Sequence, residues 1–98
     1  MKITSQMNGT ELTVAVEGRL DTTTAPELEQ ELKQRMESAN ALKLDFAKLD
    51  YISSAGLRVL LFAHKTMSKK GGMKVVNINE MVQEVFDVTG FADILNIE

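Results

Sequence analysis

Ser53, Ser54 and His64 are the side chains in this sequence with the clearest potential for chemistry. A serine hydroxyl beside an imidazole is the pairing that activates the nucleophile of many hydrolases. Here the serines come directly before a strongly helical stretch, and the histidine lies inside that stretch. At a rise of about 1.5 Å per residue, about 15 Å of helix would separate Ser54 from His64. We therefore interpret His64 as a residue on a partly buried helix flank, and the serines need another role.

Three aspartates form a second candidate group. Asp21, Asp45 and Asp50 lie near the ends of expected strands, where a parallel sheet can bring them to one edge. Such a cluster could bind Mg²⁺ or include a phosphate-accepting aspartate, as in two-component receiver domains. The chain begins with an expected hairpin in place of the strand and helix of a receiver, and this disfavours the receiver interpretation.

The composition excludes several classes of function. The 98 residues include no Cys and one His, so thiolate nucleophiles, zinc sites, disulfides and His-pair metal sites are excluded. The 11 basic and 14 acidic residues give a net charge of −3, which argues against nucleic acid as the main partner. The longest apolar run, Val59–Ala63, is far shorter than the roughly 20 residues that span a bilayer. We expect a cytoplasmic protein that is not an enzyme and has no cofactor and no metal site.

The first part of the chain predicts a β-hairpin followed by a helix. Alternating apolar residues flank Asn8-Gly9, a dipeptide typical of a two-residue type I′ turn, and Gly18 is expected to end the second strand. Thr24 and Glu27 have the spacing of a capping box, which predicts a helix from there to about Ser38. The apolar stripe of this helix consists of Leu28, Leu32 and Met36.

Strands and helices alternate in the rest of the chain. The pattern predicts a strand at Ala41–Phe46, a short loop at Leu49–Ile52, a helix from the serines to Lys70, a strand at Met73–Val76, and a third helix capped by Asn77 or Asn79. Helices between the later strands favour parallel strands joined by right-handed crossovers. The sequence thus predicts one α/β domain over residues 1–98, with an N-terminal β-hairpin and a mixed four- to five-stranded sheet against which the helices pack.

The segment Ser53–Gly56 has two interpretations. Serine at the point where a loop turns into a helix is typical of an N-cap, which accepts a hydrogen bond from a free N–H of the first turn. Alternatively, a serine here is a phosphorylation site, because a phosphoserine places about −1.5 to −2 charges against the positive end of the helix. The residues by themselves leave both interpretations open.

A locally basic stretch follows this segment. Between Leu57 and Asn79 the chain has no acidic residue and five basic ones, which are Arg58, Lys65, Lys69, Lys70 and Lys74. A solvated helix face with lysines near the helix C-terminus accounts for them, and nucleic-acid binding is disfavoured because aromatic residues are not interleaved. A basic helix face would also suit an acidic protein partner.

Four stretches of the sequence carry a resemblance to a known family. They are Val16–Asp21, Thr24–Leu28, Leu44–Phe46 together with Tyr51–Leu60, and Thr89–Phe91. In this combination the chain resembles the anti-sigma factor antagonists of the STAS domain family (sulphate transporter and anti-sigma antagonist). The resemblance extends over nearly all of the sequence and implies a STAS-like fold.

The resemblance implies a partner-switching role. An antagonist of this family binds an anti-sigma factor that is also a serine kinase and so releases the sigma factor. The kinase phosphorylates the antagonist, and a PP2C-type phosphatase restores it. The family's motif, Asp-Ser-Ser/Thr-Gly-Leu-Gly, aligns on Gly56-Leu57, which places Ser53 at the Asp, Ser54 at the first hydroxyl and Ala55 at the second. The alignment implies that Ser54 accepts the phosphate, with Ser53 as the alternative.

The resemblance also implies which residues bind the partner. The expected contacts come from the loop before the first helix and from the start of the next one, namely Asp21, Thr22, Thr23, Ser53, Ser54, Ala55, Gly56 and Arg58. The expected partners are an anti-sigma factor serine kinase and a PP2C-type phosphatase, without direct contact with nucleic acid or membrane. We expect the chain to be a monomer or a weak dimer.

Two other functions remain open. Some STAS relatives have been proposed to bind nucleotides, so a weak nucleotide-binding domain is one alternative, although the sequence has no phosphate loop. The other is a STAS subunit of a transporter or of a large stress-sensing complex.

Overall fold

The elements of the fold follow the order that the sequence predicts. A computed structural model describes residues 1–98 and contains five strands, three α-helices and one short 3-10 helix. They are β1 (Lys2–Asn8), β2 (Glu11–Leu20), α1 (Ala25–Met36), β3 (Ala41–Ile52), α2 (Ser54–Met67), β4 (Met73–Val76), α3 (Glu80–Thr89), η1 (Phe91–Asp93) and β5 (Asn96–Ile97). This confirms the α/β fold class and the N-terminal hairpin.

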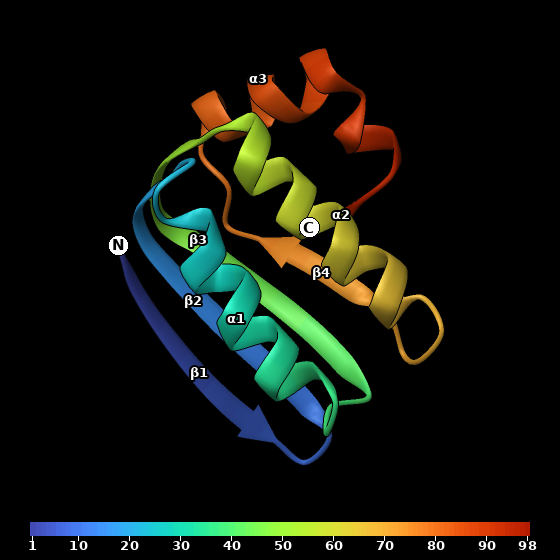
Figure 1. The fold of residues 1–98 in the computed structure, drawn as a ribbon. Helices are drawn as coiled ribbons and strands as arrows, with labels where there is room; N and C mark the ends of the chain where they lie inside the picture. Colours follow the sequence, from blue (N-terminus) through green and yellow to red (C-terminus); the bar gives the residue numbers. More distant parts are fainter.

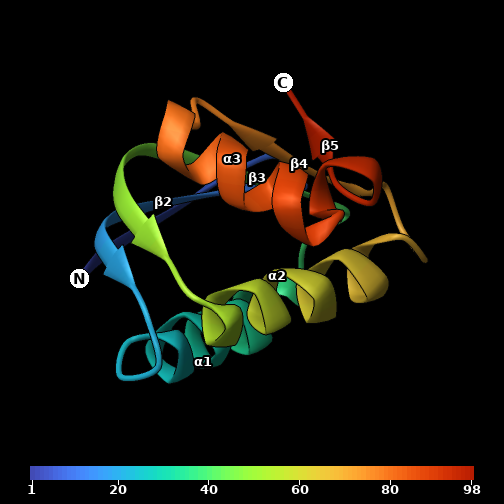
Figure 2. The ribbon, with the colours of Figure 1, turned by 90° about the horizontal axis from the view of Figure 1, so that it is seen from above.

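All five strands belong to one mixed sheet. The strand order is β1-β2-β3-β4-β5, in which β1 is antiparallel to β2 and every other neighbouring pair is parallel. Because strands that are consecutive along the chain are also neighbours in the sheet, right-handed crossovers place their connecting helices on the same face. Figure 2 shows α1 and α2 together on one side of the strands, and Figure 1 shows α3 across one end of the sheet.

One hydrophobic core lies between the sheet and the helices. It consists of 24 buried apolar residues, and no polar side chain is buried. Alternate residues of β2 and β3 point into it, and the predicted stripe of α1 is buried against them, with Leu28 and Leu32 fully buried and Met36 2% exposed. This packing fixes the positions of the loops that join the strands to the helices.

The turn of the first hairpin differs from the prediction by one residue. Asn8 pairs with Glu11, so Gly9 and Thr10 form the two-residue loop. Of these loop residues only Gly9 has a positive φ, at 63°. A type I′ turn needs a positive φ at both loop residues, whereas a type II′ turn needs it at the first alone. The prediction of a type I′ turn at Asn8-Gly9 is therefore wrong, and the φ pattern matches type II′.

Strands β2 and β3 are longer than predicted. Gly18 lies inside β2 and does not end it; its φ is 97° and the register with β3 shifts beside it. The residues predicted as a loop, Leu49–Ile52, belong to β3, so Asp45 lies in the middle of that strand and not near its end. Two register shifts add residues to β3 without ending the ladder, which interrupts the alternation on which the prediction rested.

Helix α1 begins without the predicted capping box. Thr24 has φ −95° and ψ −21°, and its side chain makes no capping hydrogen bond. Its hydroxyl instead donates to the Arg19 carbonyl oxygen at 2.7 Å and accepts from the Asp21 N–H at 2.8 Å. The hydroxyl thus closes the loop before the helix, and the capping-box prediction is wrong.

Helix α2 ends at Met67, before the predicted end at Lys70. The Lys70 ammonium donates to the carbonyl oxygens of Met36 at 2.8 Å, Glu37 at 3.3 Å and Ala39 at 3.0 Å. These carbonyl groups lie at and just after the C-terminus of α1, where helix carbonyls run out of N–H partners within the helix. That of Met36 also accepts from the Ala39 N–H at 3.1 Å. Lys70 was expected to complement the dipole of its own helix, but it caps the neighbouring helix and joins the ends of α1 and α2.

Asn79, one of the two predicted caps, begins α3. Its Oδ1 accepts from the Val82 N–H at 2.8 Å, and its Nδ2 donates to the Leu49 carbonyl oxygen at 2.8 Å, which ties the helix to β3. Asn77 has a different role: its φ is 61°, and its Nδ2 donates to Asp45 Oδ1 at 3.0 Å.

No helix of this fold has both the length and the apolar character that crossing a membrane requires.

Candidate functional site

Ser53 is the N-cap of α2. Its backbone is extended, with φ −101° and ψ 177°, and its hydroxyl accepts from the Gly56 N–H at 3.5 Å. Its own N–H donates to the Leu20 carbonyl oxygen at 2.9 Å, which fixes it against the end of β2. The side chain is half-buried. Ser53 is therefore the N-cap of the first of the two interpretations of this segment.

Ser54 is the first residue of α2 and has the properties expected of a modifiable hydroxyl. Its side chain is exposed, and its hydroxyl makes no hydrogen bond within the chain. The positive end of the helix dipole and the free N–H groups of the first turn surround this position. A phosphate at Ser54 would therefore be electrostatically compatible with the fold, and attaching it would break no existing contact.

Gly56 allows α2 to start close to the sheet. A Cβ atom at this position would lie 2.8 Å from Leu20 Cγ and 2.9 Å from Ile52 Cγ1. Those two residues end β2 and β3, so the missing side chain lets the first turn of α2 pack directly on the ends of both strands. The position of Ser54 is thereby set by the core and not by a free loop.

The loop before α1 is organised by Asp21. Its Oδ1 accepts from the N–H groups of Thr23 at 3.0 Å and Thr24 at 3.1 Å. These hydrogen bonds, with that of Thr24 the largest contribution, hold the pKa of the Asp21 carboxyl below its ordinary value of 3.8. Thr22 and Thr23 themselves are exposed. The carboxylate thus folds the loop, and the two threonines are left at the surface.

Arg19 and Tyr51 belong to the same region, and the sequence reasoning missed both. The Arg19 guanidinium carbon lies 4.3 Å from the centre of the Tyr51 ring, and Arg19 Nε lies 3.8 Å from Asp21 Oδ2. The two residues are partners in the parallel ladder of β2 and β3. Their pairing depends on the register shifts in β3, so no local sequence signal could have identified it.

A shallow groove of about 210 Å³ lies between the starts of α1 and α2. The residues that line it are Thr22, Ala25, Pro26, Glu29, Ala55, Arg58 and Val59. The structure therefore brings together three predicted site residues from two separate segments, Thr22, Ala55 and Arg58. The predicted residues Asp21, Ser53 and Gly56 hold the backbone on either side, and Ser54 is the exposed residue next to Ala55.

The three aspartates of the alternative metal or receiver site do not form a cluster. Asp45 Oδ1 accepts from the Ala47 N–H at 3.0 Å and from Asn77 Nδ2, so this carboxylate supports the bulged part of β3. Asp21 is held by its own loop, and Asp50 is exposed at the end of β3. The fold contains no group of three or more acidic or histidine side chains placed to hold a metal ion.

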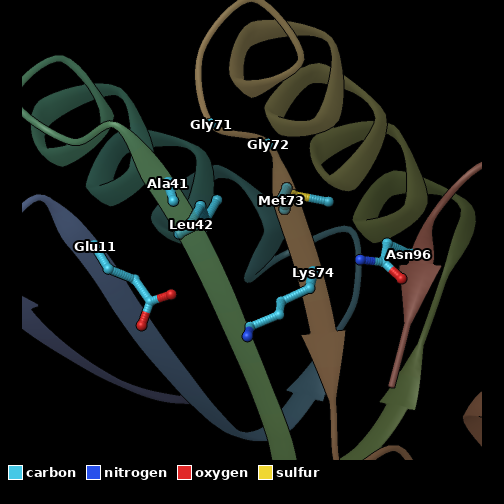
Figure 3. A pocket seen from close by; sticks show the side chains of 8 residues that line it. All are labelled: Glu11, Ala41, Leu42, Gly71, Gly72, Met73, Lys74 and Asn96. Atoms are coloured by element: carbon cyan, nitrogen blue, oxygen red, sulfur yellow. The ribbon is translucent and has the colours of Figure 1, made fainter.

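A second hollow, of about 140 Å³, lies at the opposite end of the parallel strands (Figure 3). It is lined by residues at the starts of four strands, including Glu11, Ala41, Met73 and Asn96, and by the glycines before β4. Lys74 also lines it. None of the predicted site residues lines this hollow.

Comparisons with known proteins agree with this fold. The family model described as the STAS domain matches residues 2–98. The chain is 31% identical over 93 residues to the anti-sigma-B factor antagonist of Bacillus subtilis, covering 94% of this chain and 85% of the relative.

Solved structures show the same architecture. The crystal structure of an anti-sigma factor antagonist from Mycobacterium paratuberculosis aligns with a TM-score of 0.89 at 25% identity, covering 98% of this chain and 83% of the other. The Bacillus cell fate determinant SpoIIAA in its phosphorylated form aligns with a TM-score of 0.76 at 14% identity, covering 99% and 91%, and shows likeness of fold alone. The family match over almost every residue, together with this architecture, establishes that the chain belongs to the STAS domain family.

Proposed function

We propose that this protein is an anti-sigma factor antagonist that works by partner switching. In the unphosphorylated state it binds an anti-sigma factor that is also a serine kinase, and this binding releases a sigma factor. Phosphorylation of the antagonist by that kinase ends the interaction, and a PP2C-type phosphatase restores it. The names of relatives that the chain matches over most of its length support the proposal.

The different environments of the Ser53 and Ser54 hydroxyls support the choice of the phosphorylation site. Ser53 is half-buried, and its hydroxyl accepts the hydrogen bond that caps α2. Ser54 is exposed, and its hydroxyl makes no hydrogen bond within the chain. A kinase must reach a hydroxyl and turn it toward ATP, and only Ser54 can do this without breaking the helix cap. Ser54 is therefore the proposed phosphate acceptor, and Ser53 is the alternative.

The proposed docking surface is the groove between the starts of α1 and α2 with the exposed residues beside it. From the α1 side it includes Thr22 and Thr23, and from the α2 side Ser54, Ala55 and Arg58. Small side chains at this position let a partner approach the backbone closely. Asp21, Ser53 and Gly56 keep the surface in shape through their backbone contacts.

Electrostatics explains how a phosphate would end the interaction. It adds about −1.5 to −2 charges at one point of a surface that is desolvated when the partner is bound. A charge that is buried in an interface without a partner costs several kcal/mol, which corresponds to about a hundredfold or greater loss of affinity. The phosphate would be well tolerated in the free protein, because it faces the N-terminus of α2.

This proposal describes a binding protein and not an enzyme. The STAS family and the antagonist names of the relatives favour action through protein contacts. Because a sigma factor acts on RNA polymerase, we place the interaction in the bacterial cytoplasm.

Phosphosite mapping with the cognate anti-sigma factor serine kinase tests the proposal. After incubation with ATP, mass spectrometry should find one phosphate, on Ser54. Ser54→Ala should abolish labelling, while Ser53→Ala and the control Ser38→Ala, at an exposed serine after α1, should retain it. Full-rate labelling of Ser54→Ala would move the site to Ser53, and absence of both binding and labelling would overturn the proposed function.

A further inference from the structure

The outer face of α2 has a basic stripe, which Lys69 continues just after the end of the helix. Residues at helical spacing along this face line a shallow hollow of about 370 Å³, and they are Arg58, Leu61, Phe62, Lys65, Thr66 and Lys69. Arg58, Lys65 and Lys69 are exposed, whereas Leu61 and Phe62 are half-buried between them. We call these six residues the basic stripe. It combines positive charge with two half-buried apolar side chains, of which Phe62 also packs against the core.

The outer face of α3 has an acidic stripe of the same construction. Glu80, Glu84 and Asp87 lie along the exposed side of the helix, spaced by four and three residues. Met81 is 55% exposed and Val88 is 81% exposed, and at 3.6 residues per turn both lie on the flank beside this acidic row, whereas Val82 and Phe86 are buried. We call Glu80, Met81, Glu84, Asp87 and Val88 the acidic stripe. Exposed apolar residues at a separation of seven within an acidic helix face are typical of a helix that packs against a partner.

The charged side chains of both stripes form no salt bridge within the chain. The three salt bridges of the structure join Arg19 to Asp21 and two pairs on α1, and none involves either stripe. The one side-chain hydrogen bond to a stripe carboxylate is that of Gln83 to Asp87, at 2.9 Å on the same helix. One contact from α1 reaches the basic stripe: the Lys33 ammonium lies 5.6 Å from the centre of the Phe62 ring. The charge of Lys33 itself is paired with Glu29.

The two stripes are complementary in charge and comparable in length. The basic stripe runs from Arg58 to Lys69, which is 12 residues, and the acidic stripe runs from Glu80 to Val88, which is nine residues. At a helical rise of about 1.5 Å per residue, their ends are about 16 Å and about 12 Å apart. Each places two apolar side chains among three like charges. We propose that the basic stripe of one copy of this protein binds the acidic stripe of a second copy, as a helix-on-helix contact.

The placement of the helices makes this contact head-to-tail. In Figures 1 and 2, α2 lies along the face of the sheet and α3 lies across its end, so one copy presents the two stripes on different sides. Every copy that joins leaves one stripe of each kind free, which gives short open chains instead of a closed dimer. Arg58 belongs both to the basic stripe and to the proposed docking surface. Self-association therefore covers part of that surface and competes with the partner.

Sedimentation equilibrium on the protein alone tests this inference independently of the proposed function. At millimolar concentration and low salt, the weight-average mass should rise above that of the monomer. It should return to the monomer mass in about 1 M salt, where the Debye length falls to about 3 Å. Lys65→Glu with Lys69→Glu, or Glu84→Lys with Asp87→Lys, should each weaken association at least about tenfold, because like charges then face each other.

Mixing the two double variants gives the decisive result. Each mutated stripe then meets a stripe of opposite charge on the other variant, so the mixture should associate although neither variant does so by itself. Control reversals with the same charge change at distant exposed sites, Lys2→Glu with Lys48→Glu and Glu37→Lys with Glu98→Lys, should associate as the parent protein does. A parent protein that stays monomeric at millimolar concentration, or a mixture that does not associate, would overturn the inference.

Discussion

The Ser53 hydroxyl accepts a hydrogen bond from the Gly56 N–H at 3.5 Å, and this contact separates the roles of two adjacent serines. It fixes the Ser53 side chain at the start of α2. Ser54, the next residue, belongs to the first turn and has an exposed, unbonded hydroxyl. One serine thus helps to build the helix terminus at which the other can be modified.

The two serines should respond differently to removal of the hydroxyl. Ser53→Ala removes the cap of α2 and should lower the free energy of unfolding by about 0.5–1 kcal/mol, at the low end for N-caps because the hydrogen bond is long. Ser54→Ala should change it by less than about 0.5 kcal/mol. Urea denaturation of both variants measures the difference. Equal effects on stability would contradict the assignment of the cap to Ser53.

Gly56→Ala should destabilise the protein even though alanine favours helix. The added methyl group would lie 2.8 Å from Leu20 Cγ and 2.9 Å from Ile52 Cγ1, so side chains in the core must move. The cost of overpacking exceeds the gain in helix propensity, and we expect a net loss of about 1–2 kcal/mol. Thermal denaturation checks this, with Ser54→Ala as the control in the same turn. An unchanged or raised Tm would show that α2 is not packed on the strands as tightly as described.

Asp21 should contribute to the pH dependence of stability. Its pKa in the folded state is below the ordinary value of 3.8, mainly because its carboxylate accepts from the Thr24 N–H. The corresponding stabilisation is fully present above pH 3.8 and is lost as the pH falls through the lower folded-state pKa. Asp21→Asn removes this ionisation, so its stability should decline less steeply below pH 3.8.

Urea denaturation at a series of acidic pH values measures this effect. The control is Asp50→Asn, at an exposed aspartate whose side chain makes no hydrogen bond in the structure, and it should follow the parent protein. Parallel curves for Asp21→Asn and the parent protein would show that the carboxylate of Asp21 does not organise the loop.

Lys70 and Lys69 form a matched pair for testing the link between α1 and α2. Lys70→Ala removes three hydrogen bonds to carbonyl oxygens at the end of α1 and should cost about 1 kcal/mol. Lys69, its exposed neighbour, makes no such contact, and Lys69→Ala should cost less than about 0.5 kcal/mol. Both variants lose one positive charge, so chemical denaturation compares the contacts themselves. Equal losses would contradict the capping role of Lys70.

Local sequence patterns predicted most of the helices and strands, because residues within a few positions of one another determine where these elements form. The spacing of Leu28, Leu32 and Met36 predicted α1, and Asn79 was one of the two residues predicted to begin α3. Patterns failed where a longer-range contact determined the outcome. Thr24 had the spacing of a capping box, but its hydroxyl bonds to Arg19 and Asp21. The register shifts of β3 interrupted the alternation that would have marked Leu49–Ile52 as strand.

The sequence by itself determined the α/β class, the hairpin and the serine pair before a helix, because these depend on periodicity and on residue types within a few positions. Only the tertiary structure decided which serine is free, because that depends on the cap at Ser53 and on the packing of Gly56 against Leu20 and Ile52. The meeting of Thr22 with Arg58 across the groove was likewise decided by the parallel sheet, which brings the starts of two helices together.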